Sequence, residues 1–151
     1  MDLLQQLDKT GEETLLYFSL PGNQLIKKYQ EGKWTVKQIL IHLADAEAVL
    51  MERIKKIIAE PRQVIFAFNQ DLWNEHLDYL NFPLHLSEDL FQACRHINRF
   101  LVSQHYEIHS AKEFVHSETG VRTLRMEMEK VAIHNAHHLA QIKLAIDQSI
   151  Y

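Results

Sequence analysis

The sequence has little of what disulfide-bonded, β-rich or membrane proteins need. Its 151 residues include one cysteine, Cys94, with four glycines and three prolines. A single cysteine excludes an internal disulfide framework and fits a reducing compartment, and scarce glycine and proline argue against a turn-rich β fold. No apolar run approaches the length that crosses a bilayer, and the first residues lack the features of a signal peptide. We therefore expect a cytoplasmic protein with no membrane partner.

Positive charge is also scarce. Sixteen lysines and arginines stand against twenty acidic residues, for a net charge of −4. Nucleic-acid binding usually needs a basic surface, so we expect no DNA or RNA partner. The composition, 46% hydrophobic and 24% charged, is typical of a globular helical protein. A chain of this length predicts one domain over residues 1–151.

Helical periodicity dominates what is present. Thr35-Val36-Lys37-Gln38 matches a capping box, which predicts a helix that begins at Thr35 and ends before Pro61. Ser87 is the predicted N-cap of a later helix. The four main helices are expected over residues of about 2–20, 35–60, 87–106 and 123–148, with a shorter one at about 70–80.

The remaining segments predict connections. Residues 62–69 are apolar without a period and predict an extended link rather than a strand in a sheet, and residues 107–122 predict a long loop. The third main helix has its predicted inner face at Leu90, Cys94, Ile97 and Leu101. The expected fold class is all-α, an antiparallel four-helix bundle with at least one long connection.

Three of the ten histidines fall on predicted inner stripes. His134 and His138 lie one helical turn apart among Val131 and Ile142, where β-carbons are about 5–6 Å apart. His42 shares a stripe with other inward positions of the second main helix. An imidazole buried without a partner costs roughly 1–3 kcal/mol, and one shared metal ion would satisfy all three.

The spacing alone leaves two interpretations open, a metal site or hydrogen-bonded core histidines. Three histidines with an open position are typical of catalytic zinc. Asn135 stands where a zinc-protease helix, His-Glu-x-x-His, has its glutamate, which argues against a thermolysin-like protease.

Two segments together resemble the DinB/YfiT-like family: residues 32–47, GKWTVKQILIHLADAE, and the later His134-x-x-x-His138-x-x-Gln141-Ile142. The likeness extends over nearly the whole chain, including residues 69–73 and Gly120. Members are four-helix bundles with a three-histidine metal site near one end. The resemblance implies that His42, His134 and His138 are the metal ligands.

The resemblance implies less about the reaction. Some relatives transfer low-molecular-weight thiols such as bacillithiol, mycothiol or glutathione, and a metal would activate such a thiol by lowering its pKa. We therefore expect a transferase that acts on a small-molecule substrate and uses zinc, nickel or iron with a small thiol. A metal-dependent hydrolase at the same site is one alternative, and a non-catalytic metal-binding stress or interaction protein is another. We also expect a homodimer.

Other polar residues are weaker candidates. Asp45 and Gln141 each follow a predicted ligand by three residues and could orient an imidazole or contact substrate. A position on an exposed helix face is at least as good an interpretation for Glu47, and it stays open for Asp45. Asp71 is expected to cap the helix that carries Trp73. Cys94 is interpreted as inert packing. The remaining histidines are expected on the flank, the surface or loops: His76, His85, His96, His105, His109, His116 and His137.

Overall fold

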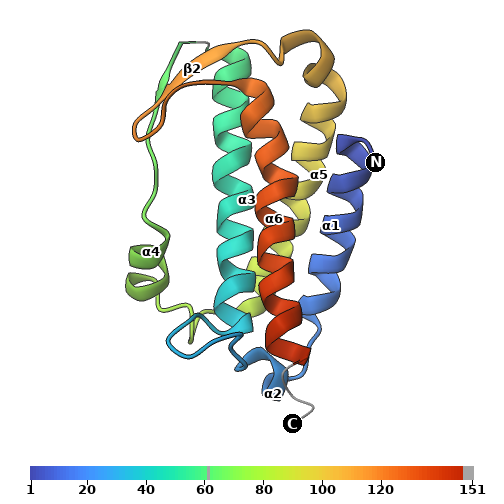
Figure 1. The fold of residues 1–151 in the computed structure, drawn as a ribbon, viewed down its shortest axis with the longest axis vertical. Coiled ribbons are helices and arrows are strands. Elements are labelled where there is room, and N and C mark those ends of the chain that lie inside the picture. Colours follow the sequence, from blue (N-terminus) through green and yellow to red (C-terminus); the bar gives the residue numbers. More distant parts are fainter. Residues whose placement is uncertain (61, 148–151) are drawn as a thin grey trace.

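The computed structural model describes residues 1–60 and 62–147, which form a four-helix bundle with a small sheet at one end (Figure 1). The helices are α1 (Leu3–Phe18), α2 (Gly22–Leu25), α3 (Val36–Ala59), α4 (Gln70–His76), α5 (Leu84–His109) and α6 (Leu124–Asp147). The strands are β1 (Val64–Ile65), β2 (Glu113–His116) and β3 (Gly120–Thr123). The predicted bundle and its long connection are confirmed. Pro61 and Gln148, the predicted ends of two helices, lie outside the described residues.

The four long helices do not all alternate in direction. In Figure 1, α1 and α6 run downward from the end that carries the sheet, whereas α3 and α5 run upward. The prediction of an antiparallel bundle is therefore wrong for two contacting pairs, because α3 runs parallel to α5 and α1 runs parallel to α6. Parallel neighbours need a connection that returns along the bundle, and residues 62–83 pass beside α3 and through α4 in this way.

Side-chain caps fix several helix starts. The predicted capping box is confirmed, since the Thr35 hydroxyl accepts from the Gln38 amide and the Gln38 side chain accepts from the Thr35 amide. Two other cap predictions are wrong. Asn69, rather than Asp71, caps α4, because its side chain accepts from the amides of residues 71 and 72. The fifth helix begins after Pro83, so Ser87 is buried one turn inside it.

The two segments predicted to lack strands form the sheet. β1 pairs in parallel with β2, and β2 pairs antiparallel with β3. In β2, Phe114 and His116 are buried while their neighbours are exposed, which is the two-residue alternation of a half-buried strand. Gly120 opens β3 with a φ of 75°, a conformation that glycine adopts without strain. Four-residue strands are too short for their pattern to stand out from loop sequence.

The buried face of α5 differs from the predicted one. Cys94 is buried as expected, but Leu90 and Ile97 are 38% and 36% exposed. Phe91, Asn98 and Val102 occupy the inner face, together with Ser87 and Arg95. Polar residues on this face shift the buried stripe by one position from the apolar stripe that the sequence shows.

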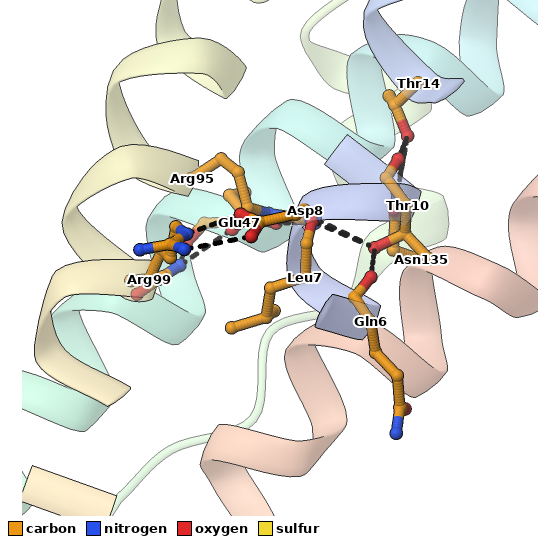
Figure 2. Close-up of polar contacts among 10 residues, drawn as sticks. Gln6, Leu7, Asp8, Thr10, Thr14, Glu47, Arg95, Arg99 and Asn135 are labelled. Carbon is orange, nitrogen blue, oxygen red and sulfur yellow. Dashed lines mark hydrogen bonds and ion pairs between the residues drawn. The ribbon is translucent and has the colours of Figure 1, made fainter. Parts of the chain in front are cut away.

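Two of those polar residues, Arg95 and Asn98, pair with the carboxylate of Glu47 inside the bundle, and Figure 2 shows the Arg95–Glu47 pair. Arg95 donates from Nε and Nη2 to the two oxygens of Glu47, each at 2.8 Å, and Asn98 donates to Glu47 Oε1 at 2.9 Å. Arg95 Nη1 also donates to the Leu7 carbonyl at 2.7 Å. Glu47 is 3% exposed, so an exposed helix face is the wrong interpretation of this residue. The ion pair fixes the register of α3 against α5, and that register positions the rest of α3.

Apolar side chains fill the bundle on either side of this pair. One cluster includes Ile54, Phe114 and Met128 near the sheet, and another includes Val36, Phe91 and Ile142 toward the opposite end. No helix within residues 1–60 and 62–147 has the length and apolar character of a membrane span.

Candidate metal centre

Three imidazoles converge between α3 and α6. His42 lies in the N-terminal half of α3, and His134 and His138 lie near the middle of α6. These two helices run in opposite directions. One nitrogen from each ring lies within 4.8 Å of the others. The ring centroids are 5.0, 4.8 and 4.6 Å apart. The structure therefore brings together the three residues that the sequence singles out.

The protonation state of these rings suits a cation. Burial is the main cause that lowers the pKa of His42 to about 2 and that of His134 to about 3. The nearby imidazole of His138 contributes to both shifts. Burial also lowers the pKa of His138. All three are therefore neutral near pH 7, the state in which an imidazole nitrogen has a free lone pair for a metal.

The distances within the cluster fit a shared ion. His42 Nε2 lies 3.1 Å from His134 Nε2. Two nitrogens at a tetrahedral zinc, each about 2.0–2.1 Å from the ion, are roughly 3.3 Å apart. The other ring nitrogen of His42, Nδ1, is buried without a hydrogen-bond partner among the described residues. The donor set therefore fits a divalent metal, and metal binding by these residues stays a prediction.

Gln141 contacts the third histidine. Its Oε1 lies 2.7 Å from His138 Nδ1. When that oxygen accepts, Nδ1 carries the proton and Nε2 presents its lone pair. The amide nitrogen of Gln141 reaches the Tyr29 hydroxyl at 3.3 Å and the exposed ring of His137 at 3.2 Å. One of the two weak polar candidates thus touches a predicted ligand.

Asp45, the other weak candidate, has a different partner. Its carboxylate accepts a hydrogen bond from the Tyr79 hydroxyl, and burial raises its pKa. This contact anchors the segment after α4 to α3. Cys94 is 3% exposed and burial raises the pKa of its thiol, which matches inert packing.

Aromatic rings cover His42. Trp34 meets it edge-on with centroids 5.1 Å apart, and Phe68, from the connection after β1, stacks on it at 6.3 Å. Trp73 of α4 packs against Phe68 at 4.8 Å. These apolar rings shield one side of the cluster from water, which strengthens electrostatic interactions there.

Two hollows reach the cluster from different sides. The first, here called the α3–α6 pocket, has a volume of about 180 Å³. Its lining includes His42, His134, Phe68, Gln70, Arg53, His116, Glu118 and Lys130. The second, the His138 groove, has a volume of about 310 Å³ and is lined by His138, Gln141, Tyr29, Trp34, Gln70 and Asp71, among others. Gln70 borders both hollows.

Sequence reasoning missed several residues of the α3–α6 pocket. His116 was expected in a loop or at the surface, but it is 6% exposed and lines the pocket from β2. Arg53 is 4% exposed on α3, and Lys130 lies one turn before His134 on α6. The sequence offered one signal for Lys130: it lies four positions before His134, and residues four apart share a helix face.

Comparison with known proteins agrees with this architecture. Residues 6–142 match the DinB superfamily. The chain belongs to the DinB superfamily.

Two relatives from Oceanobacillus iheyensis, both provisionally named metal-dependent hydrolases, are 31% and 32% identical to it. The alignments cover 87% and 92% of this chain and 75% and 79% of the relatives. YfiT from Bacillus subtilis, described as "a probable metal-dependent hydrolase with an unusual four-helix bundle topology", superposes with a TM-score of 0.87. It shares 24% identity over 97% of this chain and 85% of its own, a likeness in fold.

Proposed function

We propose that this DinB-superfamily protein is a metal-dependent enzyme in which His42, His134 and His138 hold one divalent ion. The observation that carries the proposal is the convergence of three neutral, largely buried imidazole nitrogens within 4.8 Å at the meeting point of two hollows. When bound in such a set, a zinc, nickel or iron ion lowers the pKa of a thiol or water at its open position, which supplies a nucleophile at neutral pH.

The chain's own residues prepare the site for this chemistry. Burial keeps the three histidines neutral, and Gln141 orients His138 through Nδ1. Trp34 and Phe68 shield His42 from bulk water. With these contacts in place before substrate arrives, little rearrangement is needed during the reaction.

A transferase that uses a low-molecular-weight thiol fits the two hollows best. Such a reaction brings two organic molecules to one centre, and the α3–α6 pocket and the His138 groove reach the cluster separately. In the reaction a carbon–sulfur bond forms, the bond from that carbon to its leaving group breaks, and the thiol proton passes to solvent. Metal-dependent hydrolysis is the second candidate, supported by the provisional names of the relatives.

Metal content tests the centre. Protein purified without nickel resin, because nickel binds nitrogen sites tightly whatever the physiological metal, should contain about one equivalent of a divalent metal. The triple variant His42→Ala, His134→Ala, His138→Ala should contain almost none. His137→Ala, which removes the exposed neighbouring imidazole, is the matched control and should retain the metal. Equal, near-zero metal in all three proteins would refute the centre.

Activity assays separate the two reactions. Metal-loaded protein is assayed with 1-chloro-2,4-dinitrobenzene and a panel of bacillithiol, mycothiol and glutathione, and separately with nitrophenyl esters and phosphoesters. Thiol transfer predicts thioether formation that His138→Ala abolishes while helical content stays intact. Nitrophenol release without added thiol would instead support hydrolysis. A large loss of melting temperature on chelation, without activity in either panel, would support a non-catalytic structural metal.

A further inference from the structure

We infer that the α3–α6 pocket holds an anionic group of the substrate, a carboxylate or phosphate, on Lys130 and Arg53 beside the histidine cluster. This inference rests on the proposed function, because it assigns a substrate class to the same site. The arrangement that supports it is a small cavity with two imidazoles on one wall and cationic side chains on another (lining residues His42, His134, Arg53 and Lys130).

Lys130 places an ammonium group on the wall of the α3–α6 pocket. Its ammonium makes no hydrogen bond or ion pair with any residue in the described parts of the chain, although the side chain is only partly exposed. Burial is the main influence that lowers its pKa. Lys130 lies four positions before His134 on α6, so both side chains face the cavity. A partly desolvated ammonium of this kind gains most from an anion that replaces its lost water.

Arg53 is held in place with part of its guanidinium unused. Nη2 donates to the Phe66 carbonyl at 2.9 Å, which fixes the side chain against the connection after β1. Nη1 forms an ion pair with Glu127 Oε2 at 3.7 Å, a distance too long for a hydrogen bond. A guanidinium has five N–H donors, so an anion in the cavity would find free donors here.

The charges around the cavity leave a positive excess. Arg53, Lys130 and Arg122 carry three positive charges; Glu127, fully buried, and Glu118, exposed on the rim, carry two negative ones. His116 adds no charge near neutral pH, because burial lowers its pKa. The net charge of these groups is therefore +1, without counting the charge of a divalent ion held by the histidines. An anionic substrate group would neutralise it, whereas a cationic substrate would be repelled.

The test compares matched thiols on cobalt-loaded protein. 3-Mercaptopropionate and 3-mercaptopropionamide differ in the carboxylate alone, and sulfur–cobalt charge-transfer absorption reports their binding without turnover. The carboxylate should bind about tenfold more tightly, the ratio expected for one charge-assisted contact. In Lys130→Met the ratio should fall to within twofold, and Lys130→Arg should retain it. Lys143→Met is the control, since it removes the same charge from α6 at a residue that pairs with Glu13 instead.

Equal binding of the two thiols by the wild-type protein would overturn the inference, as would an unchanged ratio in Lys130→Met. A second arm is independent of the metal. Acetate and inorganic phosphate are titrated separately into metal-free protein, and amide shifts around Lys130 and Arg53 are followed by NMR. Saturable shifts that Lys130→Met abolishes support the subsite and show which anion it prefers; their absence with both anions refutes it. Failure to bind cobalt would instead refute the proposed metal centre, and the metal-free arm would still decide the subsite.

Discussion

Replacing Gln141 by leucine should weaken metal binding without disturbing the ligands themselves. Gln141 contacts the histidine cluster through its side-chain oxygen Oε1, which lies 2.7 Å from His138 Nδ1. Leucine has similar bulk but no acceptor. The Nδ1 proton of a largely buried ring would then lack its partner, or the ring would move that proton to Nε2, where it blocks the lone pair that the metal needs.

Either outcome for the Nδ1 proton should weaken zinc binding, and the burial of His138 sets the size of the loss. His138 is 7% exposed, so water cannot fully replace the lost acceptor. An unsatisfied buried donor costs about 1–3 kcal/mol, and loss of such a contact to a metal ligand typically weakens metal affinity by about 10–100-fold. We therefore expect the zinc dissociation constant of Gln141→Leu to rise 10–100-fold, equivalent to about 1.4–2.7 kcal/mol.

Competition with a chromophoric chelator at pH 7.5 measures this constant on protein stripped of metal, and circular dichroism checks that the helices are intact. Gln141→Glu keeps an acceptor and adds charge, so it should bind zinc at least as tightly as the wild type. Tyr29→Phe removes only the hydroxyl beyond Gln141 and should stay within threefold. Zinc affinity within twofold of wild type in a folded Gln141→Leu protein would refute the assigned role of this contact.

Three further predictions concern stability, each measured by urea unfolding. Glu47→Leu leaves Arg95 buried without its carboxylate and should cost about 3–5 kcal/mol, whereas adding Arg95→Met should recover most of the loss; equal instability of single and double variants would contradict this. Gly11→Ala should destabilise the protein by about 1–3 kcal/mol despite better helix propensity, because the new Cβ would lie 3.2 Å from the Arg95 side chain; a stabilised variant would show that Arg95 moves freely. Folding lowers the pKa values of His42 and His134, so below pH 6.5 the unfolded chain binds more protons than the folded one. The metal-free protein should therefore lose stability below pH 6.5, by up to about 1.4 kcal/mol per pH unit for each histidine. A free energy of unfolding that stays constant from pH 7 to 5 would refute this.

The histidine cluster was predictable because its register is set by local signals. The capping box at Thr35 fixes where α3 begins, so the inward position of His42 follows from counting turns. His134 and His138 share a stripe with apolar residues along a continuous helix. Two stripes that both face the core of a bundle leave little freedom in where their polar members meet.

The pocket beside the cluster was not predictable in the same way. Arg53 and Arg95 are buried cations that a hydrophobic pattern assigns to the surface, and their burial depends on Glu127 and Glu47, partners distant in the sequence. The ion pair between Arg95 and Glu47 also shifts the buried face of α5 away from its apolar stripe. His116 enters through a four-residue strand, whose alternation spans too few positions to distinguish it from a loop.

The parallel direction of α3 and α5 accounts for the enclosure of the site. A short loop after α3 would reverse the chain and leave the His42 face of α3 open to solvent beside α6. Because α5 instead runs parallel to α3, the connection must return along the bundle, and it passes over His42 with Phe68 and Gln70 on the pocket wall. The Ala67 amide donates to the Ser117 hydroxyl at 2.9 Å, which ties this connection to the turn between β2 and β3. The connection that sets the topology therefore also builds the pocket, and the hairpin holds it in place.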